Sequence, residues 1–383
     1  MRLQAQGKSS KSKMTEEIAS PVDALDVSVF TIPTEEPEAD GTFMWTSTTV
    51  VVAETRAAGS SGLGFTYGTA ACATFIEDVL RDHVVGTDPM DVPAVWGSMV
   101  RAIGNQGRPG VASMAIAAVD VSLWDLKAKL LGLPLASLLG RIRHEVPVYG
   151  SGGFTSMSDE HFAEQLEGWV RRDGIPRVKM KIGTNWGTDE ERDLHRVAVA
   201  RKAIGEGSEL FVDANGAYAR KQAVRVARAL SSEGVVWFEE PVSSDDLEGL
   251  REIRDLVDID VAAGEYGYDL PFFERMLRAG AVDCLQADVS RCAGITEWLR
   301  VANLAAAHGL EISGHTAQCL HAHPACAVPN LRHVEYFADH ARVDRLLFDG
   351  VLDPAGGVLR PDPSRPGLGL ELKRSDAEAY RNR

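Results

Sequence analysis

Three short apolar stretches of this chain contain acidic residues, and these acids follow one another at equal intervals along the sequence. The stretches are Phe211–Asn215, Trp237–Pro241 and Val261–Glu265. Their acids Asp213, Glu239 and Glu265 follow one another at 26 residues, since 239 − 213 and 265 − 239 are both 26. This is about the length of one strand, one helix and two short loops in a parallel α/β unit. The spacing predicts that three consecutive parallel strands each deliver one carboxylate to their carboxyl-terminal ends, where barrel enzymes carry out their chemistry.

A set of three carboxylates indicates a hard metal ion. Mg²⁺ takes carboxylate oxygens, completes its octahedron with water or substrate, and has no use for thiolates. The alternative is that the acids are solvated residues at strand ends, where a single acid is common but a matched series is not. We therefore predict that Asp213, Glu239 and Glu265 bind Mg²⁺.

From residue 146 onward, short β-forming runs alternate with amphipathic stretches such as Asp189–Ile204 and Ala219–Leu230. The predicted strands are Val146–Gly150, Arg177–Ile182, Leu210–Asn215, Val235–Pro241, Ile259–Glu265, Asp283–Asp288, Leu310–His315 and His333–Phe337. Eight such strands close an α/β barrel. After Phe337 the sequence runs through turns rich in Gly and Pro and shows no clear final barrel helix, so we expect this tail to return to the first domain.

The residues before the barrel show strands followed by helices, without alternation. Residues 1–21 are polar and lack the apolar centre of a secretory signal, which predicts a disordered tail. An acidic loop is predicted at Thr34–Trp45. The predicted strands and helices are Val27–Pro33, Thr48–Glu54, Leu63–Tyr67, and then Ala70–His83, Val92–Ile103 and Val111–Leu131. This order predicts a separate α+β domain.

The composition excludes several kinds of partner. No run approaches the roughly 18 apolar residues of a membrane helix. A formal net charge of −15 repels nucleic acid and anionic membranes, so a small anionic substrate would have to be captured by a metal or by lysines. The 5 cysteines are scattered and lack C-x-x-C spacing, which favours a reducing compartment. We expect a cytoplasmic homo-oligomer that binds a small-molecule carboxylate, with neither nucleic acid nor a membrane as partner.

Four potential zinc ligands lie within eight residues of one another. They are Cys319, His321, His323 and Cys326. Their spacing matches no common structural zinc pattern, and buried cysteines beside histidines occur without metal, so we favour a structural role for them.

Two lysines on the second barrel strand are candidates for proton transfer. In Val178–Ile182, the period-two alternation of a strand sends Lys179 and Lys181 to one face. Their mutual repulsion and partial burial should lower the pKa of at least one of them, which is how a lysine becomes a base near neutral pH. The alternative is a solvated pair on an edge strand, which a parallel barrel with covered strands disfavours.

An aspartate and a histidine end the sixth and seventh predicted strands. Asp288 could accept one ring N–H of His315, fix its tautomer and leave the other nitrogen free to exchange a proton with substrate. Taken alone, His315 would more often be a structural histidine. Glu335 in the eighth strand is a lone acid that could point into the same cavity.

With these residues in place, the sequence resembles the enolase superfamily, specifically its mandelate racemase group, over nearly the whole chain from about Val27. The motifs are Lys179-x-Lys181, Asp213-Ala-Asn215, Glu239-Glu-Pro241, Gly264-Glu265, Gln286-x-Asp288, His315, Glu335 and the helix signature Ala118–Leu126. The resemblance implies an α+β capping domain at residues 22–140 and a modified (β/α)₇β TIM-type barrel at 141–340. Residues 341–383 would then rejoin the cap.

The resemblance also implies roles for the site residues. The three acids would bind Mg²⁺, and Lys181 and His315 would act as bases on either side of the substrate. Lys179 would contact the substrate carboxylate and lower the pKa of Lys181, Asp288 would orient His315, and Glu335 would donate a hydrogen bond to the enediolate.

Several reactions are compatible with these residues. We predict dehydration of a sugar acid to a 2-keto-3-deoxy acid, with racemisation, epimerisation or cycloisomerisation on the same site as the alternative. A non-catalytic binding protein is disfavoured because none of the acids, lysines or dyad residues is missing. A Schiff-base aldolase would use one lysine but leave the three acids unexplained.

The predicted substrate contacts come from two cap segments and one barrel residue. Trp45, Tyr67 and Asn215 are predicted to meet the substrate, with Tyr67 contacting its hydroxyls. The acidic loop carries Glu35, Glu36 and Glu38, which would repel a second substrate carboxylate by about 1 kcal/mol for each close pair of charges. We therefore predict a monocarboxylic sugar acid in preference to a diacid.

Overall fold

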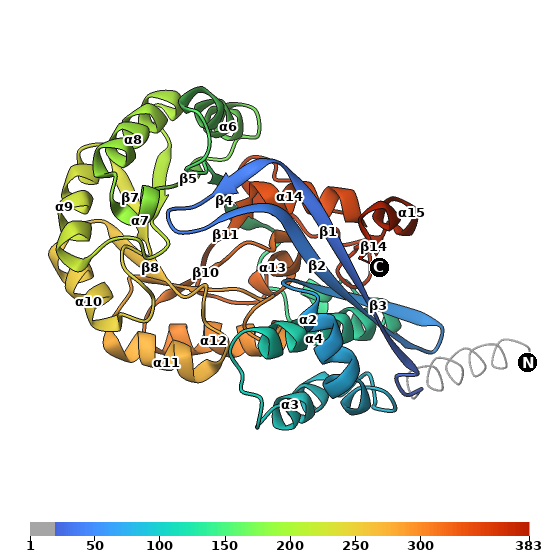
Figure 1. The fold of residues 1–383 in the computed structure, drawn as a ribbon. Coiled ribbons are helices and arrows are strands. Elements are labelled where there is room, and N and C mark those ends of the chain that lie inside the picture. The colour runs from blue at the N-terminus through green and yellow to red at the C-terminus, as the bar shows by residue number, and fades with distance from the viewer. Residues whose placement is uncertain (1–19, 383) are drawn as a thin grey trace, which may run out of the picture.

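Eight parallel strands form a closed ring in the computed structural model, which describes residues 20–382 (Figure 1). The ring follows the chain order, and the last strand pairs with the first. The strands are β4 (Val146–Gly152), β5 (Arg177–Lys181), β6 (Glu209–Asp213), β7 (Val235–Glu239), β8 (Asp260–Ala263), β9 (Cys284–Ala287), β10 (Glu311–Gly314) and β11 (Leu331–Phe337). All eight predicted strands are present, with ends that differ by a few residues. Residues 1–19 of the predicted disordered tail lie outside the described part.

Helices surround this ring on the outside (Figure 1). They are α6 (Asp159–Arg171), α8 (Glu190–Ile204), α9 (Arg220–Ser231), α10 (Leu247–Leu256), α11 (Leu270–Ala279), α12 (Ile295–Ala307), α13 (Gln318–Ala325) and α14 (Ala338–Leu347), with the short α7 (Thr184–Gly187) after β5. The prediction that no helix follows the last strand was wrong. Helix α14 begins directly after β11 and buries Val343 and Leu347, an apolar face too short to stand out in the sequence.

Helix α11 shows why these segments are helical. The Asp269 side chain caps its start by accepting a hydrogen bond from the Phe272 amide at 2.9 Å, and Gly280 ends it in the left-handed conformation at φ 63°. Its buried face consists of Phe273, Met276 and Leu277. Each of these side chains contributes about 1.5–3 kcal/mol by leaving water.

An antiparallel sheet and a group of helices precede the barrel. The sheet consists of β1 (Ala24–Ala39), β2 (Met44–Ala57) and β3 (Ser60–Tyr67), and α3 (Val92–Ala102) and α4 (Val111–Leu130) follow it. The predicted helix at residues 70–83 is three short segments, α2 (Ala71–Phe75), a π-helix (Ile76–Leu80) and a 3₁₀ turn (Arg81–His83). Ile76 and Leu80 stay buried through this change.

The predicted acidic loop at Thr34–Trp45 is mostly strand. β1 continues to Ala39 and β2 begins at Met44, with Glu38 paired to Trp45 after a break in register. The tip of this hairpin reaches the carboxyl-terminal end of the barrel, where the Thr155 and Trp186 amides donate to Ala39 and Gly41 carbonyls at 2.8 and 2.9 Å (Figure 1). Contacts with the barrel thus extend strands whose acidic sequence disfavours them.

Glycine is required at the tip of this hairpin. A Cβ atom on Gly41 would lie 2.6 Å from the Gly183 carbonyl oxygen, a distance that side-chain carbons do not tolerate. The hairpin can therefore lie directly against the loop after β5 only because residue 41 has no side chain.

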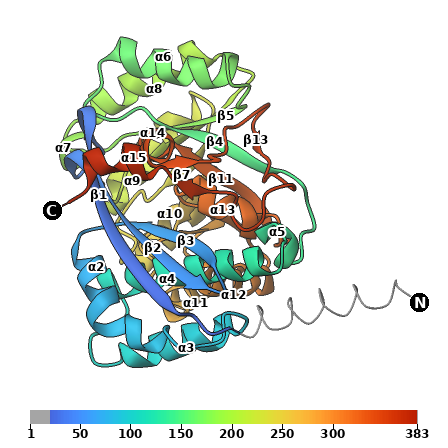
Figure 2. The same ribbon diagram turned by 90° about the vertical axis from the view of Figure 1, so that its right-hand side faces the viewer.

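The end of the chain lies against the first sheet (Figure 2). After β12 (Phe348–Asp349), β13 (Val358–Leu359) and β14 (Glu371–Leu372), the short α15 (Arg374–Ala377) leads to a 3₁₀ turn (Glu378–Tyr380). Arg374 pairs with Glu54 of β2 at 2.6 Å, and the Asn382 amide donates to the Val29 carbonyl of β1 at 2.8 Å. The first and last parts of the chain are thereby joined.

A buried aspartate on α4 joins three parts of the chain. The Asp125 carboxylate accepts the Leu63 amide at 2.7 Å and the Leu368 amide at 2.6 Å, and it pairs with Lys129 at 2.7 Å. Replacement of Asp125 by alanine should lower the free energy of unfolding by about 3–5 kcal/mol, because it leaves two amides without an acceptor and Lys129 without its counter-ion. Urea denaturation measures this loss. Exposed Asp78 is the control, and an Asp125→Ala loss no larger than that of Asp78→Ala would contradict this account.

Candidate active site

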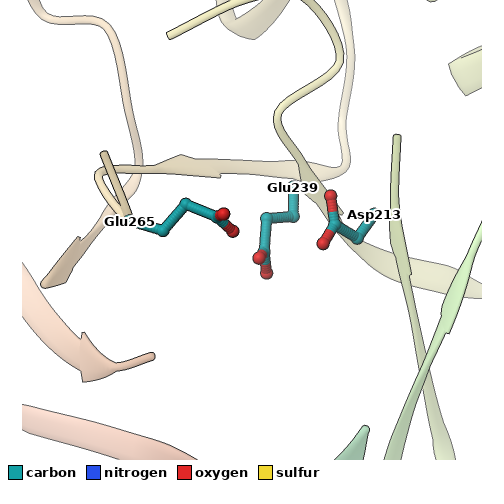
Figure 3. A group of neighbouring side chains, drawn as sticks. All are labelled: Asp213, Glu239 and Glu265. Carbon is teal, nitrogen blue, oxygen red and sulfur yellow. The ribbon is translucent and has the colours of Figure 1, made fainter. Parts of the chain in front are cut away.

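The three acids predicted from their spacing lie together at the carboxyl-terminal end of the barrel (Figure 3). Asp213 and Glu239 are the last residues of β6 and β7 and lie opposite each other in the sheet register, and Glu265 follows β8. Each contributes one oxygen to a group in which all three atoms lie within 4.8 Å of one another. Within residues 20–382, this is the one such group of acidic, histidine or cysteine side chains.

The charges of this group suit a divalent cation. Asp213 and Glu239 are fully buried and Glu265 nearly so. Burial raises the pKa of Glu239 to about 8, and the nearby carboxylate of Asp213 adds to the rise. Buried like charges repel one another strongly, and an oxygen-only set of this kind fits Mg²⁺.

Two lysines of β5 point toward these acids, as the strand alternation predicted. Buried Lys179 lies 2.8 Å from both carboxylate oxygens of Glu239 and 2.9 Å from Glu335. Buried Lys181 donates to Asp213. The two lysines are therefore not a solvated pair on an edge strand.

The prediction that at least one of the two lysines has a lowered pKa is wrong when only the groups of the protein are considered. Burial lowers the pKa of Lys181, and Lys179 also lowers it, but the carboxylates of Asp213, Glu265 and Glu239 together raise it by more, so the pKa of Lys181 is raised. The pKa of Lys179 is raised in the same way, because Glu239, Glu335 and Asp213 together outweigh its burial. Attraction by the acids outweighs the repulsion between the two ammonium groups.

The predicted pair of aspartate and histidine is present across the barrel from the lysines. The His315 Nδ1 atom lies 2.9 Å from an Asp288 oxygen, and its Nε2 atom lies 3.2 Å from Glu265. Burial lowers the pKa of His315, but Glu265, Glu335 and the bond to Asp288 raise it to about 10. The chain thus offers a nitrogen for proton transfer on β5 and another just after β10. Around the ring, β4 and β11 lie between these two strands on one side, and β6 to β9 lie between them on the other.

Glu335 of β11 lies between Lys179 and His315. Its carboxylate accepts the Thr316 amide at 2.9 Å and lies 3.7 Å from the His315 Nε2 atom. Burial raises the pKa of Glu335, but the positive charges of Lys179, His315 and Lys181 together lower it by more, so the net pKa is lowered. Glu335 is ionised at neutral pH in this arrangement, whereas the donor role implied by the family resemblance requires a proton.

A cavity of about 380 Å³ opens above these groups and is roofed by the β1–β2 hairpin. Lys181, Glu265, His315 and Glu335 line it, whereas Lys179 does not. Lys179 therefore does not reach the cavity, although the family resemblance implies that it contacts the substrate carboxylate. It lies beneath the cavity and pairs with Glu239 and Glu335.

The three predicted substrate contacts all line this cavity, but their polar atoms are used differently. The Tyr67 hydroxyl donates to Asp344 at 2.5 Å, and its ring stacks on His340, so Tyr67 offers the cavity a ring face instead of the expected hydroxyl. The Trp45 Nε1–H donates to Glu38 at 2.9 Å. The Asn215 side-chain oxygen is buried and has no hydrogen-bond partner.

The acids of the hairpin lie elsewhere than predicted. Glu35, Glu36 and Glu38 line a separate cavity of about 200 Å³ on the other side of the hairpin. Burial and the nearby Asp339 raise the pKa of Glu38 to about 8. Asp40 lines the cavity of about 380 Å³ instead, and Asp339 lines both cavities. The preference for a monocarboxylic substrate stays a prediction, and it no longer rests on the three glutamates.

Two site residues were missed in the sequence. The Tyr149 hydroxyl of β4 lies 3.4 Å from the Lys179 Nζ atom. The only sequence feature that could have indicated Tyr149 is the alternation of this first barrel strand, which turns its side chain inward. Arg291 lies 3.3 Å from a Glu265 oxygen and 3.6 Å from an Asp288 oxygen, and it lines the cavity. The sequence feature that could have indicated Arg291 is its position three residues after Asp288.

The four potential zinc ligands are not gathered around one point. The His321 Nδ1 atom lies 2.9 Å from the Thr316 carbonyl, and its Nε2 atom accepts the Val289 amide at 3.0 Å. His323 contacts the Leu368 carbonyl at 3.0 Å through Nε2. These bonds satisfy both rings within the protein, as expected for structural histidines.

The burial of His323 predicts a dependence of stability on pH. Burial lowers its pKa from an ordinary 6.5 to about 4, so the unfolded chain binds a proton at higher pH than the folded chain does. The folded state therefore keeps its full stability above pH 6.5. Its free energy of unfolding falls as the pH drops toward 4, by roughly 3 kcal/mol in total. His323→Gln should lose less unfolding free energy between pH 7 and 4.5 than the natural protein. Exposed His195, replaced by glutamine, is the control, and an equal loss in both variants would contradict this assignment.

Comparison with known proteins gives a consistent family. Residues 27–140 match the mandelate racemase / muconate lactonizing enzyme N-terminal domain, and residues 161–377 match the enolase C-terminal domain-like family. A mandelate racemase/muconate lactonizing enzyme-like protein from Rubrobacter xylanophilus has 55% identity and a TM-score of 0.91, covering 94% of this chain and 100% of that one.

Two further relatives carry named activities. L-Talarate dehydratase from Polaromonas sp. JS666, solved in complex with Mg and L-glucarate, has 32% identity and a TM-score of 0.85, covering 95% of this chain and 98% of that one. The 3,6-anhydro-alpha-L-galactonate cycloisomerase from Streptomyces coelicolor is 35% identical over 82% of this chain and 86% of that protein. No helix within residues 20–382 is long and apolar enough to cross a membrane.

Proposed function

Because this chain belongs to the mandelate racemase/muconate lactonizing enzyme family of the enolase superfamily, we propose that it dehydrates a sugar acid to a 2-keto-3-deoxy acid. In this reaction one base removes the proton beside the carboxylate, and the β-hydroxyl leaves as water after it gains a proton. The observation that carries the proposal is the position of Lys181 and His315 across the barrel from each other, with the three acids on the strands between them.

The residues of the chain divide the work as follows. The Lys181 Nζ atom and the His315 Nε2 atom reach the cavity and can take or return a proton from either side. Asp288 accepts the His315 Nδ1–H and so directs Nε2 toward the substrate. Lys179 lies beneath Lys181 and balances the charge of Glu239 and Glu335.

The three acids are proposed to hold Mg²⁺, as their oxygen-only set and the magnesium in a relative indicate. When bound, Mg²⁺ supplies positive charge that stabilises the charge developing on the substrate carboxylate and offsets the pull of the acids on the lysine protons.

An isomerase reaction is the second candidate, and the 35% identical cycloisomerase favours it. Racemisation, epimerisation and cycloisomerisation need the same abstraction of the α-proton by Lys181 or His315. They differ from dehydration in that no keto acid forms.

A screen of aldonic and aldaric acids with Mg²⁺ tests the proposal. Dehydration should give a 2-keto-3-deoxy acid from at least one compound, with a preference for monocarboxylic acids. Exchange of the α-proton with deuterium, together with isomerisation and no keto acid, would support the second candidate. Neither product nor exchange with any compound would contradict both.

The proposal includes a small-molecule carboxylate as partner and a cytoplasmic homo-oligomer as the working form. The five cysteines are all free and buried, in keeping with a reducing compartment. Sedimentation of the purified chain measures the assembly, and a monomer at all concentrations would contradict it.

A further inference from the structure

A second cavity, of about 550 Å³, lies beside the catalytic cavity at the mouth of the barrel. Asn215 and Tyr266 line both cavities, so these side chains mark the boundary between the two. Each cavity by itself lies in the range of small-molecule sites. The second one is therefore large enough to hold a chemical group of its own next to the reacting one.

An exposed tryptophan in the strained α7 segment forms one wall of the second cavity. Trp186 has 67% of its surface exposed, and it follows Asn185 in two successive left-handed conformations at φ 59° and 52°. Large side chains rarely adopt this conformation, and strain of this kind collects at functional sites. The Trp186 amide is held by the Gly41 carbonyl at 2.9 Å, so its indole stays at the cavity instead of packing into the core.

Further aromatic rings accompany this indole. Tyr266, with 41% of its surface exposed, Tyr268 and Phe272 line the same cavity. Flat apolar faces that remain open to water in a concave site are typical of surfaces that bind a ligand by stacking.

Acceptor atoms without partners lie at the inner end of the cavity. The Glu240 side chain has 1% of its surface exposed, and its Oε1 atom has no hydrogen-bond partner. The Asn215 Oδ1 atom is likewise buried and unpaired. Buried acceptors are normally satisfied, so these two call for a group that brings hydrogen-bond donors.

The charges of the cavity restrict what that group can be. Besides buried Glu240, the acidic residues that line it are Asp245 and Asp269, and among the residues that the structure describes Arg275 is its one basic residue. This balance disfavours a second anionic group and favours a neutral one with several hydroxyls. A sugar ring combines hydroxyl donors with an apolar face that stacks on aromatic rings.

We propose that this cavity is a distal subsite that binds a sugar ring attached to a hydroxyl beyond the reacting carbons of the substrate, so that the preferred substrate is a glycosylated aldonic acid. The inference rests on the proposed function, since the carboxylate end of the same molecule would occupy the catalytic cavity. Trp186 and Tyr266 would contact the ring, and Glu240 and Asn215 would accept its hydroxyls.

Comparison of short and extended acids tests the subsite. Maltobionate, cellobionate and lactobionate each carry a hexose on gluconate, so gluconate is their common short reference. At least one of them should exceed gluconate in kcat/KM by about tenfold or more. In Trp186→Ala and Tyr266→Ala this ratio should fall toward one, mainly through a higher KM for the extended acid. Val236 is an exposed apolar residue at the opposite end of the barrel, and Val236→Ala should keep the ratio.

Two results would overturn the subsite. One is turnover of gluconate with none of the extended acids reaching its kcat/KM, and the other is a ratio that both aromatic variants leave unchanged. If no acid of either length is turned over or exchanged, the proposed function itself fails. In that case the binding of maltobionate, measured by saturation-transfer NMR, tests the subsite separately. Loss of the signal from the distal hexose in Trp186→Ala supports the subsite, and equal signals in Trp186→Ala and the natural protein overturn it.

Discussion

Replacement of Glu239 by glutamine should lower kcat/KM by at least about 10³-fold and weaken Mg²⁺ binding. Glutamine has the same shape, so it can still accept the Trp237 Nε1–H that now lies 3.0 Å from the carboxylate. It lacks the negative charge that a metal ligand on β7 must supply and that balances Lys179 at 2.8 Å. Titration calorimetry with Mg²⁺ measures the binding, and keto-acid formation measures the activity.

The control for this variant is a carboxylate on the same barrel but at its other end. Glu209 begins β6, is partly exposed and pairs with Arg177 at 3.0 Å. Glu209→Gln should leave Mg²⁺ affinity and kcat/KM unchanged. If Glu239→Gln also leaves both unchanged, the metal site is assigned to the wrong residues.

Removal of either base should reduce net turnover by about 10²- to 10⁴-fold. Lys181→Met removes the amine of β5, and His315→Asn removes the imidazole that Asp288 orients at 2.9 Å. Because the two groups reach the cavity from different sides of the barrel, each variant should still exchange the α-proton of one substrate stereoisomer with deuterium. NMR in D₂O measures the exchange, and product assays measure turnover.

Exposed residues of the same types give the controls. Lys202 and His195 both belong to α8 and lie on the outside of the barrel. Lys202→Met and His195→Asn should retain full turnover. Loss of exchange with every stereoisomer in both Lys181→Met and His315→Asn would show that the bases do not act independently.

The sequence by itself determined the barrel and the elements from which the site comes. Strand, helix and loop lengths repeat, so an interval of 26 residues returns the chain to the same end of the next strand, and Asp213, Glu239 and Glu265 meet there. The alternation of a strand likewise sends Lys179 and Lys181 inward. Such periods are local properties, and local properties can be read from the chain alone.

Contacts between distant segments were decided only by the tertiary structure. The acidic segment 34–45 is mostly strand because its pairing and its contact with the barrel outweigh its composition. The Tyr67 hydroxyl is occupied by Asp344, 277 residues further along, so it is unavailable to a substrate. The open face of Trp186 likewise depends on how the hairpin holds its backbone.

The sign of the lysine pKa shift shows the same limit. The sequence places two ammonium groups together and so predicts repulsion, but the balance depends on which carboxylates other strands bring within a few ångströms. Asp213 and Glu239 come from β6 and β7, and they raise the pKa of Lys181 and Lys179 instead. Electrostatic energy depends on distance in space, which the order of residues along the chain does not contain.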